Sequence, residues 1–348
     1  MAFPERPLPA AAAVAFHVAL ARRARREPFS HIVEGREFYG LPLRVTADVL
    51  DPRPDSETLI DAVLAAVADH TAPLRVLDLG TGSGCLLLAL LTALPQAVGV
   101  GVDVCPRALA VAQENARRLG LLSRCAFRVG DWGTGITAHF DLVISNPPYI
   151  PTAEIAALQL EVALYEPRRA LDGGGDGLAA YRALIPQAAM LLCDAGVVAL
   201  ELGVGQWEPV AALLRTAGLP RLRWQSDLTG VPRCVLATRD GVQGVFRVER
   251  RCAPLEDSHR LAPPQASTAS SDGVPVPADL SPLVASSRVS IGASVGKDRK
   301  RYSNVLVSTS AEVWFPPFGE GGDAFGSVRG GKQQTECLAL VVQRLRQG

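Results

Sequence analysis

Short apolar runs alternate with helix-like segments from about residue 73 to residue 239. The runs that predict strands are, in chain order, 74–80, 99–104, 125–130, 140–146, 196–203, 222–227 and 233–239. The segments that predict helices between them are 85–94, 106–120, near 176–192 and near 206–217. An unbroken apolar run such as LRVLDLG is typical of a strand covered on both faces. The pattern predicts an α/β fold: a doubly wound, mostly parallel seven-stranded sheet with an antiparallel hairpin at one edge.

The segments on either side of this alternating core have a different character. Residues 1–27 predict one helix. Residues 28–72 predict a β-hairpin in REFYGLPLRV and then a helix in SETLIDAVLAAVADH, opened by a capping box at Ser56. Residues 240–348 are rich in Ser, Pro and Gly with little periodicity, which favours a disordered extension. The apolar run over 10–21 is too short to span a bilayer, so we expect no membrane anchor.

Composition narrows the classes of function. The chain has 348 residues, 48% of them hydrophobic, and a formal net charge of zero. It can therefore bury a sizeable core, and its neutral balance argues against stable nucleic-acid binding over a broad surface. Seven scattered cysteines without a CxxC pair predict reduced thiols in a cytoplasmic protein. The five histidines have no metal-binding spacing, so no metal site is predicted.

A glycine-rich stretch, DLGTGSGC (78–85), lies between a predicted strand and a predicted helix, the context that a nucleotide-binding loop requires. Its glycines let the backbone turn sharply and approach a ligand closely. Asp103, at the end of the next predicted strand, is placed to accept both hydroxyls of a ribose. The alternative is a plain strand–helix turn with a capping acid, and the pair of Asp78 and Asp103 favours the ligand. A nucleoside triphosphate is disfavoured because no Lys-Ser/Thr pair follows the glycines.

The next predicted strand ends in GDW (130–132). Asp131 is placed to accept a hydrogen bond from an exocyclic amine, and Trp132 to flank a purine ring. An aromatic residue alone is more often part of the core. The Asp-Trp pair at a strand end favours contact with adenine.

The stretch DLVISNPPYI (141–150) places two prolines and a tyrosine directly after β-forming residues. Asn146 offers a side-chain carbonyl and Pro147 a backbone carbonyl in a fixed direction, which together suit a planar NH₂ group beside Tyr149. An amide nitrogen is a poor nucleophile, so the site must supply its alignment. No general base is needed before attack, because the proton can leave from the alkylated nitrogen. The alternative, a proline-rich turn that only closes a strand, is disfavoured by the preceding glycine loop.

Together these motifs resemble the class I S-adenosylmethionine-dependent methyltransferases, which have a Rossmann-like fold. More narrowly, the chain is similar to the peptide chain release factor N5-glutamine methyltransferases, the HemK/PrmC family, from about residue 20 to residue 239. NPPY alone is not specific, because adenine-N6 DNA methyltransferases also use it. The stretches that carry the resemblance are REFYGLPL (36–43), PRPDSE (52–57), VLDLGTGSG (76–84), NPPY (146–149), EPRRALDGGGDGLAAYR (166–182), LELGVGQ (200–206) and DLTGVPR (227–233).

The resemblance implies a protein-(glutamine-N5) methyltransferase. Its cofactor would be S-adenosyl-L-methionine, and its substrate the glutamine of the Gly-Gly-Gln motif in class I peptide chain release factors. The implied cofactor-binding residues are Asp78, Gly80, Thr81, Gly82, Gly84, Asp103, Asp131, Trp132 and Asn146. The implied substrate-binding residues are Asn146, Pro147, Pro148, Tyr149 and Arg53, and the catalytic ones among them are Asn146, Pro147 and Tyr149.

The resemblance also implies a division of the chain. Residues 1–27 would be the remnant of a helical substrate-recognition domain, and 28–72 a hairpin and helix linker. Residues 73–239 would form the methyltransferase domain, and 240–348 a low-complexity extension. Two alternatives stay open: an adenine-N6 nucleic-acid methyltransferase, and a cofactor-binding relic whose shortened front no longer docks its partner. A nicotinamide-dependent oxidoreductase is disfavoured, since no acid or base for hydride transfer follows the glycine loop.

Overall fold

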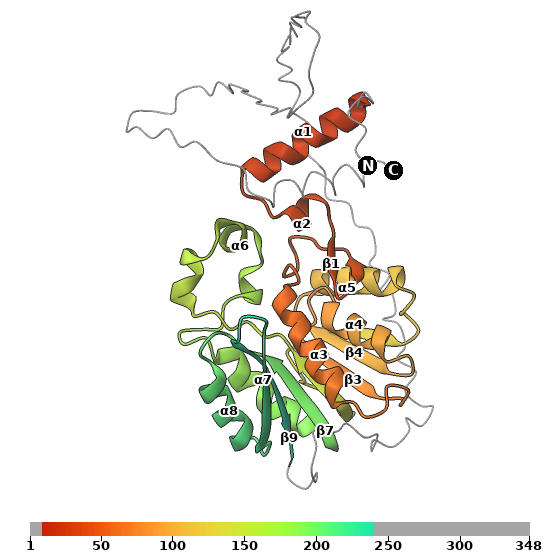
Figure 1. Ribbon diagram of the computed structural model, residues 1–348, viewed down its shortest axis with the longest axis vertical. Helices are drawn as coiled ribbons and strands as arrows, with labels where there is room; N and C mark the ends of the chain where they lie inside the picture. The colour runs from red at the N-terminus through yellow and green to blue at the C-terminus, as the bar shows by residue number, and fades with distance from the viewer. Residues whose placement is uncertain (1–8, 240–348) are drawn as a thin grey trace, which may run out of the picture. The chain divides into compact units, whose positions relative to one another are not determined.

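A seven-stranded sheet forms the centre of the computed structural model, which describes residues 9–239 (Figure 1). The strand order is β5-β4-β3-β6-β7-β9-β8. The β7–β9 and β8–β9 pairs are antiparallel and the other pairs are parallel, which confirms the predicted sheet with its antiparallel edge hairpin. The strands are β3 (Arg75–Leu79), β4 (Val98–Asp103), β5 (Cys125–Val129), β6 (Phe140–Ser145), β7 (Leu192–Glu201), β8 (Arg221–Ser226) and β9 (Pro232–Thr238).

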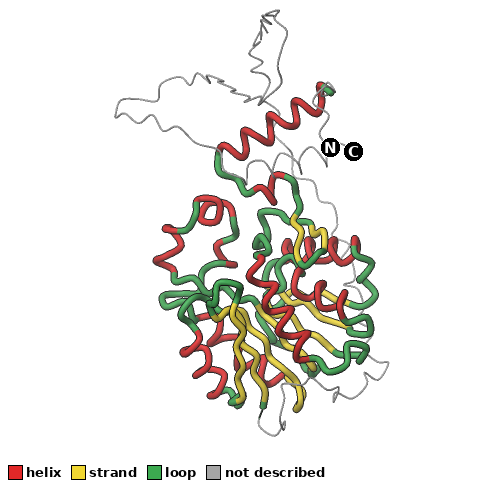
Figure 2. Tube along the Cα trace, in the orientation of Figure 1, coloured by secondary structure: helices red, strands yellow, loops and turns green. Residues whose placement is uncertain are grey.

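Helices cover both faces of this sheet (Figure 2). Val76 of β3 packs with α3 and α4 on one face, and its neighbour Leu77 packs with α7 and α8 on the other. Because side chains alternate along a strand, covering both faces requires apolar residues at consecutive positions. The helices that flank the sheet are α3 (Glu57–Ala66), α4 (Cys85–Ala93), α5 (Pro106–Arg118), α7 (Ala179–Leu191) and α8 (Trp207–Thr216).

The strand order reverses direction between β3 and β6. From β3 the chain runs outward through β4 to β5, and it then returns to place β6 on the other side of β3. The carboxyl ends of the strands open into a crevice at such a reversal. The glycine loop follows β3 and the NPPY loop follows β6, so this topology brings the two predicted motifs to one place.

Smaller elements precede the sheet and follow the NPPY loop. Antiparallel pairing of β1 (Arg36–Phe38) with β2 (Leu41–Leu43) confirms the predicted hairpin. Glu161 receives ion pairs from Arg23 at 2.9 Å and Arg26 at 3.1 Å, which join α1 to α6. The remaining elements are α1 (Ala10–Ala24), α2 (Phe29–Ile32), η1 (Pro54–Ser56), η2 (Thr152–Ala157), α6 (Leu160–Tyr165) and η3 (Arg168–Ala170).

The predicted capping box at Ser56 is wrong. Ser56 has helical dihedrals (φ −68°, ψ −17°) at the end of η1, and its side chain makes no capping hydrogen bond to α3. A capping residue needs an extended backbone to aim its oxygen at the helix, so a serine already inside a helical turn cannot serve. The helix also ends earlier than predicted, at Ala66, because Val67 turns to an extended conformation.

Other predictions meet the structure in part. Cys85, Cys105, Cys125 and Cys234 are free thiols, as predicted at those four positions. Within residues 9–239, no helix is long and apolar enough to cross a membrane. The predicted disordered extension over 240–348 lies outside the described residues.

Candidate active site

A first cavity opens at the carboxyl ends of β3 and β4. Its walls include Asp48, Val49 and Leu50 from the segment before η1. Most of the predicted cofactor-binding residues line it, so the topology does bring them together. The predicted site residues on its wall are Gly80, Thr81, Gly82, Asp103, Asp131, Trp132, Asn146, Pro148 and Arg53.

A second cavity lies beside the first, on the side of α6. Pro147 and Tyr149 line it, together with Val162 of α6. Arg53 and Asn146 line both cavities. The predicted substrate residues therefore stand between a space beside the glycine loop and a space beside α6.

The glycine loop is held by its backbone and by Asp103. Gly80 and Gly82 have φ values of +76° and +55°, which residues with a side chain rarely adopt. The Gly82 N–H donates to Asp103 Oδ2 at 2.9 Å, and the Cys105 N–H donates to Oδ1 at 2.9 Å. Each carboxylate oxygen keeps a free lone pair, so the Asp103 side chain is fixed in direction and still able to accept hydroxyls.

Asp78 and Gly84 do not appear on the wall of either cavity. Asp78 is buried, and its Oδ2 accepts a hydrogen bond from Thr81 Oγ1 at 2.6 Å, which ties the loop to β3. Its Oδ1 is buried without a partner among the described residues. Burial raises the pKa of Asp78 to about 7, and the nearby Asp103 carboxylate acts in the same direction. A positively charged ligand near the loop would relieve this penalty.

Trp132 packs over the glycine loop. Its ring lies 3.4 Å from the point that a Cβ on Gly80 would occupy. A Cβ at position 80 would therefore only touch the indole, and the cost of a side chain there comes from the backbone strain. Asp131 and Trp132 stand together on the wall of the first cavity, as the sequence predicts.

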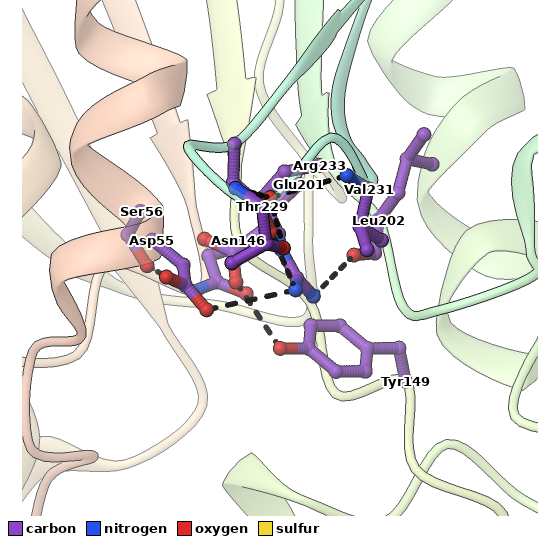
Figure 3. A network of polar contacts seen from close by, with 10 residues as sticks. Asp55, Ser56, Asn146, Tyr149, Glu201, Leu202, Thr229, Val231 and Arg233 are labelled. Atoms are coloured by element: carbon purple, nitrogen blue, oxygen red, sulfur yellow. Dashed lines mark hydrogen bonds and ion pairs between the residues drawn. The ribbon is translucent and has the colours of Figure 1, made fainter.

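The NPPY loop is held by side chains from distant segments (Figure 3). Asn146 Nδ2 donates to Ser56 Oγ at 3.2 Å, which leaves the side-chain carbonyl of Asn146 for another partner. The Tyr149 hydroxyl donates to Glu201 Oε1 at 3.2 Å. The Tyr149 carbonyl accepts from Gln206 Nε2 at 2.9 Å. Burial raises the pKa of Tyr149, so its phenol stays protonated and acts as a donor here.

Sequence reasoning missed several residues of this site. Glu201 ends β7 and is 1% exposed, and burial raises its pKa to about 7 against the opposing effect of the Ser56 and Tyr149 hydroxyls. Glu166 is also buried, and its Oε1 accepts from Arg53 Nη2 at 2.6 Å. Burial raises the pKa of Glu166 to about 7. An acid inside an apolar run, as in VVALELG, is the one signal that pointed to Glu201.

The fold and the paired cavities define a methyltransferase of the α/β class. A family model described as "Methyltransferase domain" matches residues 70–203. Among the described residues, no cluster of His, Cys, Asp or Glu could hold a metal ion.

Curated relatives narrow this class to one family. A release factor glutamine methyltransferase of Rhodospirillum rubrum is 50% identical over 254 residues, which cover 73% of this chain and 74% of that protein. One of Caulobacter vibrioides is 49% identical over 225 residues, 64% of this chain and 78% of that protein. This chain belongs to the release factor glutamine methyltransferase family. Among solved structures, the catalytic domain of hMettl16 in complex with MAT2A 3′UTR hairpin 6 is 16% identical with a TM-score of 0.49, over 62% of this chain and 81% of that one. An identity and a TM-score this low give no information about the substrate of this chain.

Proposed function

We propose that this protein transfers a methyl group from S-adenosyl-L-methionine to the N5 side-chain amide of a glutamine in class I release factors. One observation carries the proposal: the two cavities meet at Asn146, whose side-chain carbonyl is left free to hold an amide. The names of the Rhodospirillum rubrum and Caulobacter vibrioides relatives support the same substrate. They also disfavour an adenine-N6 nucleic-acid methyltransferase.

The donor set of the first cavity fits the proposed cofactor. Asp103 presents a fixed acceptor for ribose hydroxyls, and Asp131 with Trp132 presents an acceptor beside an aromatic face for adenine. Asp78 lies off the wall of this cavity, and its buried carboxyl supports the loop through Thr81. S-Adenosylmethionine, when bound, supplies an electrophilic methyl group.

The residues of the NPPY loop would align the substrate. The carbonyls of Asn146 and Pro147 accept the two hydrogens of the glutamine NH₂ group, and Tyr149 walls the second cavity beside it. With both hydrogens held, the nitrogen presents its lone pair toward the first cavity. Alignment of a weak nucleophile supplies the main rate enhancement, and the proton is lost from nitrogen after methyl transfer.

The proposed division of the chain follows from this function. In this proposal, residues 1–27 contribute to substrate recognition, 28–72 form a β-hairpin and helix linker, and 73–239 form the methyltransferase domain. The proposed place of action is the cytoplasm, and the proposed partner is the release factor alone, without stable nucleic-acid binding.

The test is methyl transfer from labelled S-adenosylmethionine to a purified class I release factor. The substrate controls are a release factor with Gly-Gly-Ala in place of Gly-Gly-Gln, and a DNA duplex. We expect label on the unmodified release factor only. Label on DNA alone would establish the adenine methyltransferase, and cofactor binding without transfer to either would establish the relic.

A further inference from the structure

Buried side chains from η1 and β7 contact the NPPY loop (Figure 3). Asn146 Nδ2 donates to Ser56 Oγ, and the Tyr149 hydroxyl donates to Glu201 Oε1. Ser56 and Glu201 are 2% and 1% exposed. The Tyr149 phenol bonds to Glu201 Oε1, and Glu201 Oε2 is buried without a partner among the described residues. Ser56 and Tyr149 both act to lower the pKa of Glu201, against the burial that raises it. Neither Ser56 nor Glu201 belongs to the loop that they support.

The chemistry of these groups fixes the direction of each hydrogen bond. When Glu201 is ionised it can only accept, so a hydroxyl that faces it, such as that of Ser56, donates to it. The remaining lone pairs of Ser56 Oγ can only accept, so the group that faces them must donate. Asn146 meets this demand with its NH₂ group. An amide that is turned to donate at one side presents its carbonyl at the other.

We propose that Ser56 and Glu201 are positioning residues that set the orientation of the Asn146 amide, so that its carbonyl faces the substrate amide. The proposal deepens the proposed function and rests on it for the identity of the substrate. Without an acceptor that holds its NH₂ group, the Asn146 amide has two orientations of similar shape. Only one of them presents the carbonyl to the hydrogens of a substrate NH₂ group. Tyr149 is fixed by the same carboxylate.

The positioning groups are themselves firmly anchored. The Glu201 carbonyl accepts from the buried Tyr181 hydroxyl at 2.7 Å, and Glu201 lies opposite Cys234 in the β7–β9 pair. Arg233 bridges Asp227 at 2.9 Å and Asp55 at 3.6 Å, which holds the turn that carries Ser56 against the start of β9. A rigid support of this kind is what a precisely oriented amide requires.

The test observes the Asn146 amide directly. The chain has only three asparagines, at positions 115, 146 and 304, so asparagine labelled with nitrogen-15 gives few side-chain signals, and Asn146→Ala identifies the one of interest. In Ser56→Ala and Glu201→Gln we expect that signal to shift and its hydrogens to exchange about fivefold to tenfold faster, as for a lost hydrogen bond. The matched control is Ser30→Ala, a serine that is also 2% exposed and whose Oγ has no partner among the described residues.

Kinetics provide a second readout. We expect both variants to lower kcat about tenfold, with KM and the affinity for S-adenosylhomocysteine within about twofold of the parent. Ser56→Thr, which keeps the hydroxyl, should restore both the signal and the rate. An unchanged Asn146 signal in both variants, or an equal change in Ser30→Ala, would overturn the proposal. If the parent enzyme fails to methylate release factors, the proposed function falls, and the amide signal still decides the positioning role.

Discussion

The two sides of this site are built in different ways. On the cofactor side, the site is built from one loop and the adjacent strand end. Gly80 and Gly82 supply left-handed turns, and Asp103 holds the loop by accepting from the Gly82 N–H. On the substrate side, the NPPY loop depends on side chains from η1 and from the end of β7, Ser56 and Glu201. The first side is a local structure, and the second exists only when the chain is folded.

This difference separates the effects that substitutions should have. A change on the cofactor side acts through backbone strain and shows as weaker cofactor binding. A change on the substrate side acts through orientation and shows as slower turnover with cofactor binding intact.

Asn146→Ala should have the largest effect, because it removes the carbonyl that holds the substrate amide. We expect kcat to fall by a factor of about 10² to 10³, as for the loss of one positioned polar group at a reaction centre. Calorimetric affinity for S-adenosylhomocysteine should stay within about threefold. A loss of affinity for S-adenosylhomocysteine that matches the loss of kcat would place Asn146 on the cofactor side. It would contradict the separation of cofactor-side from substrate-side residues.

Glu201→Gln should change the pH dependence of stability. The folded-state pKa of Glu201 is raised to about 7, so the folded protein pays to ionise this carboxyl, and stability falls as pH rises from about 4.5 through 7. Glutamine has no such cost. The free energy of unfolding of the variant, relative to the parent, should therefore rise by about 2–3 kcal/mol between pH 5 and pH 8.

Denaturant titrations of both proteins at several pH values measure this difference. Asp78 and Glu166 also have pKa values raised to about 7, and they cancel in the comparison because both proteins contain them. A difference that does not change with pH would mean that Glu201 titrates normally. The same variant should be slower in catalysis, so stability and turnover would move in opposite directions.

Gly82→Ala should weaken cofactor binding about tenfold, because a side chain strains the loop at a φ of +55° and shifts its backbone. Gly230→Ala is the matched control: its φ is +86°, and at both positions a Cβ would meet nothing within 4 Å. Both variants should lose about 1–2 kcal/mol of stability through the same backbone strain. Only Gly82→Ala should change the affinity for S-adenosylhomocysteine, measured by calorimetry.

Glu161→Gln should have the smallest effect. It removes the ion pairs of Glu161 with Arg23 and Arg26, whose side chains are 42% and 53% exposed and so partly screened by solvent. We expect a loss of less than about 1 kcal/mol in thermal unfolding, and no change in cofactor affinity. A large fall in kcat for release factor would show that the joint between α1 and α6 takes part in positioning the substrate.

The same contrast explains what the sequence could predict. The strands, the edge hairpin and the glycine loop follow from local patterns, and Asp103 follows from its place at a strand end. Ser56 was predicted as a helix cap because SETL has the right local spacing, yet η1 gives it a helical backbone and turns its hydroxyl to tertiary partners. Nothing local distinguishes these two uses of one serine.

The NPPY loop shows the same limit. The chemistry of its residues alone predicted two hydrogen-bond acceptors for an NH₂ group, the carbonyls of Asn146 and Pro147. The pattern could not show which way the Asn146 amide is turned, because that depends on Ser56 and Glu201, which are far away in the chain. Asp78 was predicted on the cofactor wall, whereas the structure buries it beneath the loop, where it holds Thr81.

Tandem mass spectrometry of the reaction product tests the central claim most directly. A class I release factor is incubated with the protein and S-adenosylmethionine, and the peptide that contains Gly-Gly-Gln is then sequenced. The account predicts the added mass of one methyl group on the glutamine side chain, present with the parent protein and lost with Asn146→Ala. A methyl group on any other residue, or an equal yield from the Asn146 variant, would contradict it.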